Sequence, residues 1–330
     1  MTSVKYIAVE KDEENMRFDR WFKNHYPQIN FVNLQRILRS GQIRLDKKRV
    51  KSNDRIQSGQ VVRIPPIVNA LNNMIKDEKK SDFSVAKHSE FLKSILLYAD
   101  SHIYVFNKPA GISVQGGSGI TNHIDGFLQS WADSKLQKPR LIHRLDQDTS
   151  GLLVVARTRI AAQNLTESFR MRRIKKIYWS LVWGVPQNKK KCISNWLLKK
   201  NQAGGDYVRV VNPGEKGANH AISYFKIIDS FAQKFCWLEM QPYTGRTHQL
   251  RVHALHMGYP IVGDKKYFIN SKGNFADCIQ KKLYLHARYI DLPHPEGGRL
   301  QITAPLPEHM VETWKSFGFQ YKQDLCFQRL

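Results

Sequence analysis

Short apolar segments separated by polar turns dominate residues 91–330. Most of them are rich in β-branched or aromatic side chains, which is the pattern of strands in a sheet. The predicted strands cover residues 95–98, 103–106, 152–156, 178–182, 221–228, 236–240 and 283–290. Stretches with helical spacing are fewer and lie near residues 122–132, 159–171, 248–257 and 306–316. Because strands and helices do not alternate regularly, the pattern predicts an α+β domain on a mostly antiparallel or mixed β-sheet with flanking helices.

The first part of the chain combines helical spacing with short strands. Phe18, Trp21 and Phe22 recur at the spacing of one helix face, and a second amphipathic stretch covers residues 32–38. Two short apolar segments follow this stretch. Residues 14–66 are therefore expected to form a small αβ module of two helices and a small sheet.

Between these two parts the composition changes. Residues 67–90 hold many Asn and Ser side chains, four basic and four acidic residues, and little material for a core. Such a stretch is typical of a linker, and part of it is expected to dock on the next domain as a short helix. The expected organisation is a module over 14–66, a linker over 67–90 and a domain over 91–330.

The net charge of the chain points to a polyanionic partner. Its 52 Lys and Arg residues exceed its 28 Asp and Glu residues, which gives a net charge of +24. Such an excess favours nucleic acid, because contacts with phosphates release counterions. No apolar run approaches the roughly 20 residues that cross a bilayer, and the polar N-terminus is unlike a signal peptide. We therefore expect a cytoplasmic protein without membrane contact, with its four separated cysteines reduced.

Basic residues concentrate in the second half of the N-terminal module. Residues 31–66 contain nine Lys and Arg side chains against two acids. An ordinary solvated turn would explain part of this charge, but a basic helix next to a basic turn favours phosphate contact. The candidate RNA contacts in this module are Arg36, Arg39, Lys47, Lys48 and Arg49.

One acidic residue stands out in the larger domain. Asp146 lies between an Arg-Leu pair and a turn of Thr, Ser and Gly, just before the predicted strand 152–156. It is therefore expected on a loop at the mouth of the sheet, where catalytic groups are common. Taken alone, a loop Asp is more often a turn former or helix cap, so the assignment depends on its partners.

A second constellation lies far downstream, in the segment TGRTHQLRVH at 244–253. A strand leads there into a glycine turn and a helix, whose N-terminus favours anions. Arg246 and Arg251 would strengthen such a site, and Arg251 is expected to hold the Asp146 carboxylate ionised and oriented. His248 and His253 are five residues apart without a zinc motif, so no metal is expected.

Two further segments add candidate contacts with RNA. Tyr178 reads as a strand aromatic, but cations precede it, and aromatic faces flanked by cations are how proteins hold an unstacked base. The cations in question are Arg172, Arg173, Lys175 and Lys176. Lys108 follows another predicted strand and is expected either to touch RNA or to support the site.

Four motifs occur in the order found in one enzyme family. They are NKPAG at 107–111, HRLDQDTSG at 143–151, KIY at 176–178 and TGRTHQLRVH at 244–253. With them the domain resembles the RluA-type pseudouridine synthases. The segments RFDRWF, RILRSGQIRLDKKR and SGQVVRIPP of the first module resemble the S4-type RNA-binding domain.

The resemblance implies a role for individual residues. Asp146 would be the catalytic carboxylate and Arg251 its partner. Tyr178 would pack on the uracil and is a proposed general base, and Arg144 would help to evict the target base. We add His143, Arg246 and Lys108 as candidate substrate contacts.

Pseudouridine formation exchanges an N1–C1′ bond for a C5–C1′ bond without redox change, so no cofactor is expected. The sequence leaves open whether Asp146 attacks C1′, adds to C6 of the base or removes a C2′ proton. The expected substrate is 23S ribosomal RNA, within large-subunit assembly intermediates, and the protein is expected to be a monomer. A tRNA substrate, and a non-catalytic assembly factor that binds ribosomal RNA, are the alternatives.

Overall fold

Two compact units make up the chain in the computed structural model. The first comprises Met1–Lys87 with Ala132–Gln137, and the second comprises His88–Trp131 with Lys138–Leu330. The residues that the structure describes are 4–26, 29, 31–66, 68, 82–117, 122–133, 137–202, 205–267 and 279–321. Most of the predicted linker therefore lies outside the described residues.

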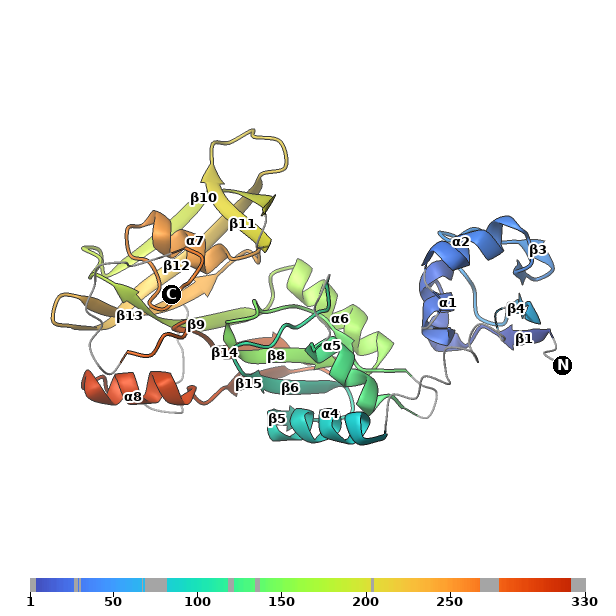
Figure 1. Cartoon of the computed structure of the whole chain (residues 1–330), viewed down its shortest axis with the longest axis horizontal. Helices are drawn as coiled ribbons and strands as arrows, with labels where there is room; N and C mark the ends of the chain where they lie inside the picture. The colour runs from blue at the N-terminus through green and yellow to red at the C-terminus, as the bar shows by residue number, and fades with distance from the viewer. Residues whose placement is uncertain are drawn as a thin grey trace. The chain divides into compact units, whose positions relative to one another are not determined.

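The N-terminal unit packs two helices on a small antiparallel sheet, as the hydrophobic pattern predicted (Figure 1). Its elements are β1 (Lys5–Ala8), a 3-10 turn (Lys11–Glu13), α1 (Phe18–His25), α2 (Phe31–Arg39), β2 (Arg44–Leu45), β3 (Lys48–Arg49) and β4 (Val61–Ile64). The strand order is β1-β4-β2-β3. Phe18, Trp21 and Phe22 are almost fully buried, since their spacing directs all three to the inner face of α1.

The larger unit is built on one mixed sheet, which confirms the predicted fold class. Its strands are β5 (Leu96–Ala99), β6 (Ile103–Lys108), β7 (Arg140–Leu141), β8 (Ser150–Ala156), β9 (Lys175–Trp183), β10 (Lys190–Gln202), β11 (Gly205–Val211), β12 (Asn219–Phe231), β13 (Phe235–Pro242), β14 (Leu285–Pro293) and β15 (Arg299–Thr303). The main path runs β11-β10-β12-β13-β9-β14-β8-β6-β5.

A short parallel contact joins the two halves of this sheet. Strands β8 and β14 pair in parallel through His286 with Ser150 and Ala287 with Gly151, whereas the other described ladders are antiparallel. Gly151 has φ of 108°, and a Cβ there would overlap the carbonyl oxygen of Ala287. The close approach of the two strands therefore requires glycine at this position.

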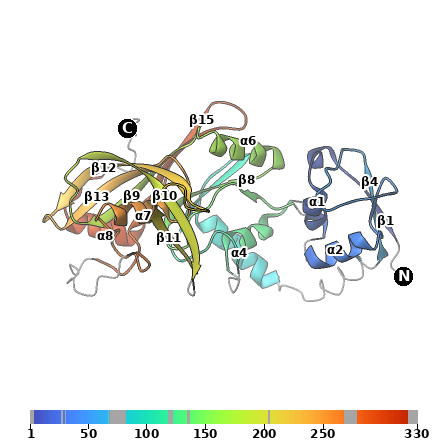
Figure 2. The same cartoon turned by 90° about the horizontal axis from the view of Figure 1, so that it is seen from above.

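Helices cover both faces of the sheet. They are α4 (Asp82–Ser94), α5 (Ile124–Phe127) with a 3-10 turn (Leu128–Trp131), α6 (Arg159–Arg170), α7 (Gln249–His256) and α8 (Glu308–Ser316). Figure 2 shows α7 enclosed by the curved strands β10 to β13. Helix α8 packs on β13 through Trp314, whose ring lies 5.5 Å from that of Trp237. No helix among the described residues is long and apolar enough to span a membrane.

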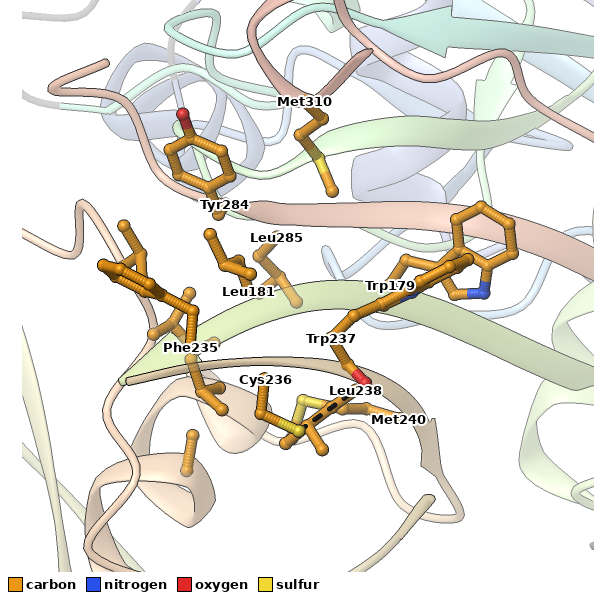
Figure 3. Close-up of a cluster of buried hydrophobic side chains, with 14 of the residues drawn as sticks. Trp179, Leu181, Phe235, Cys236, Trp237, Leu238, Met240, Tyr284, Leu285 and Met310 are labelled. Carbon is orange, nitrogen blue, oxygen red and sulfur yellow. Dashed lines mark hydrogen bonds between the residues drawn. The ribbon is translucent and has the colours of Figure 1, made fainter. Parts of the chain in front are cut away.

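Large side chains fill the core between β9, β12, β13 and β14 and the helices α7 and α8 (Figure 3). Trp179 and Trp237 meet edge to face at 4.6 Å, and the buried thiol of Cys236 contacts the Trp237 carbonyl. Cys192 is also a free thiol, whereas Cys278 and Cys326 lie outside the described residues. This densely packed half includes β13 and α7.

The predicted strands and helices of the larger unit are all present, with ends that shift by a few residues. The short strands β7 and β15 and the hairpin of β10 and β11 were not predicted. The strands of this hairpin bury few apolar residues, such as Leu197 and Val208, and lysines interrupt the pattern. Helix α4 occupies the end of the predicted linker, and its Leu92 is buried in the core of the larger unit.

Candidate active site

The loop that carries Asp146 is fastened to its neighbours by backbone contacts. Lys108, at the end of β6, is fully buried, and its ammonium donates hydrogen bonds to the carbonyls of Pro109, Ile112 and Gln147 at 2.8 to 2.9 Å. Burial lowers the pKa of Lys108 to about 8. Three carbonyl acceptors match the three hydrogens of an ammonium group. Lys108 therefore supports the loop, one of the two roles expected for it, and does not line the pocket.

His143 fastens the other end of the same loop. Its Nε2 accepts a hydrogen bond of 2.8 Å from the backbone N–H of Val154, and its ring stacks on Phe169. Burial lowers the pKa of His143 to about 3, so the ring is neutral at pH 7. It contributes to the pocket wall and also anchors the loop to β8.

The turn before α7 is organised by Gln249. Its side-chain oxygen accepts hydrogen bonds from the Thr244 hydroxyl at 2.7 Å and the Arg246 backbone N–H at 3.0 Å. Its amide group donates to the carbonyl of Ile222 and the hydroxyl of Ser223 on β12. One buried amide thus ties the turn to the sheet and sets where α7 begins.

Asp146 and Arg251 meet across the pocket, as the sequence predicted. Nη1 of Arg251 lies 3.5 Å from Oδ2 of Asp146, whose side chain is 18% exposed. The strongest partner of Arg251 is another acid, because its Nε and Nη2 each donate a 2.7 Å hydrogen bond to Asp264. Burial opposes the ionisation of Asp264, but these bonds and two backbone amides outweigh it and lower its pKa. The guanidinium group is therefore held rigidly where it faces Asp146.

A pocket of about 330 Å³ lies between this loop and α7. That volume suits a small ligand or a single extruded base. Its lining includes Ile142, His143, Arg144, Leu145, Asp146, Phe169, Lys176, Tyr178, Thr244, Arg246, His248, Arg251 and Leu285. Residues from the loop before β8 and from α6, β9, β13, α7 and β14 therefore meet at one cavity, although they are far apart in the sequence.

Tyr178 points into this pocket from β9. Burial raises the pKa of Tyr178 far above its ordinary value, and the charge of Asp146 adds to the effect. The side chain is therefore a neutral phenol at pH 7. This state suits packing against a base, and it disfavours a phenolate acting as general base.

Three basic side chains of the pocket remain to be placed. Arg144 is exposed at the rim. Arg246 is also exposed, and its Nε donates to the carbonyl of His220. Lys176 lies deeper, next to the Phe169 ring, and burial lowers its pKa to about 8. The pocket thus presents cations at different depths, an arrangement suited to a nucleotide.

The remaining predicted RNA contacts lie outside the pocket. Arg172 is exposed and stacks on the ring of Tyr243 at 4.6 Å, Arg173 is exposed, and Lys175 is half-buried on β9. In the N-terminal unit the predicted contacts are exposed on α2 and on the hairpin of β2 and β3. They are Arg36, Arg39, Lys47, Lys48 and Arg49.

Sequence reasoning missed three residues of the site. His248 was considered only as a metal ligand, yet its Nε2 lies 3.9 Å from Oδ2 of Asp146. Asp264 holds Arg251, and Tyr267 contacts both Arg251 and His248. Of the three, only Asp264 had a local signal in the sequence, the glycine before it. The structure explains that glycine, since Gly263 has φ of 74° and no room for a Cβ.

Known proteins that are similar to this chain in sequence are named pseudouridine synthases. Residues 102–256 match the family model described as RNA pseudouridylate synthase. The chain is 35% identical over 318 residues to ribosomal large subunit pseudouridine synthase C of Buchnera aphidicola subsp. Baizongia pistaciae, covering 92% of this chain and 95% of the relative. It is 34% identical over 315 residues to the Vibrio cholerae protein of the same name, covering 94% and 96%.

A solved structure agrees with these sequence relatives. Human RNA pseudouridylate synthase domain containing 4 aligns over 72% of this chain and 98% of its own, with a TM-score of 0.60 and 25% identity. The sequence motifs had predicted resemblance to the synthase C type in particular, and the relatives confirm that resemblance. The chain belongs to the RluA-type RNA pseudouridine synthase family.

Proposed function

We propose that this protein converts uridines of the large-subunit (23S) ribosomal RNA to pseudouridine, with Asp146 as the catalytic carboxylate. The observation that carries the proposal is the convergence of Asp146, Tyr178 and Arg251 from separate elements on one pocket. The choice of substrate is supported by relatives named large-subunit pseudouridine synthases, which match nearly the whole chain.

The reaction is an isomerisation, so its atoms balance within one nucleotide. The N1–C1′ bond breaks, C5 bonds to C1′, and the hydrogen of C5 is lost while N1 gains one. An ionised Asp146 is required whether it attacks C1′, adds to C6 or removes the C2′ proton. Arg251 faces this carboxylate at 3.5 Å and orients it. Tyr178, as a neutral phenol, supplies a face for the base.

The uridine must leave its stack before it can enter the pocket. Flipping a base out of a helix costs a few kcal/mol of free energy, which a few new hydrogen bonds or ion pairs with the protein can offset. Arg144 is exposed at the rim next to Asp146, so its guanidinium can occupy the vacated position and stack on the neighbouring bases. Arg246 and Lys176 supply charge for the flanking phosphates or the base.

The N-terminal unit offers a second RNA surface, which we propose to be an S4-type domain over residues 14–66. Its sheet aligns three arginines in one cross-strand row, Arg63 with Arg44 and Arg44 with Arg49. Like charges directly opposite each other are unfavourable in a sheet. Their guanidinium groups make no ion pair with a carboxylate of the described residues. A phosphate backbone lying across the row would relieve the repulsion.

We further propose that residues 67–90 link this domain to a catalytic domain over residues 91–330. On this proposal the protein acts as a monomer, in the cytoplasm, on intermediates of large-subunit assembly. Sedimentation of the protein with ribosomal precursor particles, compared with mature subunits, tests the partner.

The decisive experiment replaces Asp146 by Asn, which keeps the size of the side chain and removes its charge. Unmodified 23S rRNA is incubated with each protein, and pseudouridine is mapped by sequencing after selective chemical labelling. We expect Asp146→Asn to bind the RNA as the wild type does and to form no pseudouridine. Activity of the variant equal to wild type would refute the role of Asp146. A wild type that binds 23S rRNA but modifies neither it nor tRNA would favour the assembly-factor alternative. A wild type that modifies tRNA alone would show that tRNA, and not 23S rRNA, is the substrate.

A further inference from the structure

His248 occupies an unusual backbone position next to the catalytic loop. It immediately precedes α7 with φ of 53° and ψ of 18°, in the left-handed region that non-glycine residues rarely adopt. Such strain persists only where the surroundings impose it, and it is common at functional sites. Here the Gln249 contacts fix the turn, and the imidazole is directed into the pocket with a side chain only 11% exposed.

A second residue fixes the hydrogen of this imidazole. The Tyr267 hydroxyl lies 2.7 Å from Nδ1 of His248 and accepts a hydrogen bond of 3.0 Å from the Val208 backbone N–H. A phenol has one hydrogen to donate. Among the described residues Nδ1 is the acceptor within its reach, so the hydroxyl donates to Nδ1. The imidazole hydrogen is thereby assigned to Nε2, the atom that faces Asp146.

The two donors from α7 converge on one carboxylate oxygen. Nε2 of His248 lies 3.9 Å and Nη1 of Arg251 lies 3.5 Å from the same Oδ2 of Asp146. Both distances exceed a hydrogen bond, and such contacts tighten when substrate closes the site. The other oxygen, Oδ1, has no hydrogen-bond partner among the described residues and is left to act on the nucleotide.

Tyr267 and Arg251 are themselves held by one turn. The backbone N–H of Tyr267 donates to Oδ1 of Asp264, the acid that binds Arg251, and the guanidinium lies 5.1 Å from the Tyr267 ring. The two donors that face Asp146 therefore share one rigid support. A histidine that merely filled space would not need this second hydrogen bond.

We propose that His248, with its Nε2 hydrogen set by Tyr267, is a positioning residue that donates to Oδ2 of Asp146 and leaves Oδ1 as the reacting oxygen. This inference rests on the proposed function of Asp146. The role differs from that of Arg251, because a neutral donor orients the carboxylate without adding a second positive charge. Burial lowers the pKa of His248, which keeps the ring neutral at pH 7.

Two variants that differ by one methylene test the role. Asn tolerates the left-handed backbone but is too short to reach Asp146, whereas the amide nitrogen of Gln extends about as far as Nε2. We expect His248→Asn to lower the single-turnover rate on unmodified 23S rRNA about 10- to 100-fold, the effect of losing one hydrogen bond to a charged group. His248→Gln should recover most of the rate, and the dissociation constant for RNA should stay constant in both.

The hydroxyl of Tyr267 supplies an independent test. Tyr267→Phe should slow the reaction as His248→Asn does, and the double variant should be no slower than His248→Asn, because both changes break one chain of hydrogen bonds. Tyr224→Phe, on the exposed outer face of β12, is the matched control and should leave the rate unchanged. If Tyr267→Phe unfolds at a much lower temperature than the wild type, the comparison of His248→Asn with His248→Gln still tests the proposal.

Each result bears on the proposal. A wild-type rate in His248→Asn would overturn it. A single-turnover rate of His248→Gln as low as that of His248→Asn would also overturn it. So would a change in RNA affinity without a change in rate. Additive losses in the double variant would separate Tyr267 from His248 and refute the assigned tautomer. A wild type that forms no pseudouridine on any RNA would instead refute the proposed function.

Discussion

Arg251 gives its two shortest hydrogen bonds to Asp264 and faces Asp146 with its remaining nitrogen. Asp264→Asn should therefore slow pseudouridine formation while Asp146, the proposed catalytic carboxylate, is itself untouched. Because the variant leaves a buried guanidinium without its charge partner, we expect a loss of about 3 kcal/mol in the free energy of unfolding. Urea unfolding and single-turnover rates measure the two effects.

The matched control for this pair is Glu215→Gln, which breaks the exposed ion pair with Arg209. Exposed pairs of this kind contribute about 0 to 1 kcal/mol. Equal losses from the two variants would mean that Arg251 does not depend on Asp264 for its position.

Lys108→Met tests whether the buried lysine supports the loop or touches RNA. Methionine has a similar length but leaves three carbonyls without a donor, so we expect the free energy of unfolding to fall by about 2 to 4 kcal/mol. The single-turnover rate should fall as well, because the loop that carries Asp146 loosens, while RNA affinity stays constant. Exposed Lys234→Met is the control for loss of charge. Weaker RNA binding with normal stability would assign Lys108 to substrate contact instead.

Gly151→Ala should be among the most damaging single-methyl additions in the larger unit. The new Cβ would be forced onto the Ala287 carbonyl, in addition to the cost of positive φ. Gly214→Ala isolates the second effect, because Gly214 has φ of 90° with open space around it. We expect about 1 kcal/mol for Gly214→Ala and several-fold more for Gly151→Ala, measured by urea unfolding. Similar losses would show that β8 and β14 can separate freely.

Acid should weaken the contact between Asp100, in the turn from β5 to β6, and His294, in the turn from β14 to β15. Burial opposes the ionisation of Asp100, but hydrogen bonds from Tyr98, the His102 backbone and His294 outweigh it and lower its pKa to about 2, against 3.8. A lowered carboxyl pKa adds stability above the unfolded value of 3.8, and this contribution is lost as pH falls from there toward 2.

Asp100→Asn should therefore cost about 1 to 2 kcal/mol in the free energy of unfolding at pH 7 and less at pH 3. Urea unfolding at the two pH values measures the difference, with exposed Asp229→Asn as control. An equal loss of unfolding free energy at both pH values would show that the charge of Asp100 does not hold the turn between β14 and β15.

Local pattern predicted most of the fold because each strand and helix repeats its apolar residues at short range. The hairpin of β10 and β11 escaped prediction because Lys199, Lys200 and Arg209 interrupt the short apolar runs that hold its few core residues. Within the site, the approach of Arg251 to Asp146 was predicted and is observed. The contacts of Asp264 and Tyr267 depend on tertiary distances that no local spacing encodes.

The parallel pairing of β8 with β14 extends over two residue pairs, between two halves that each have a separate hydrophobic core. Asp146 enters the pocket from one half, and Tyr178 and Arg251 enter from the other. The position of Asp146 relative to Tyr178 and Arg251 therefore depends on the two residue pairs at which β8 and β14 meet. The geometry of the site is then a property of this joint as much as of the residues that it brings together.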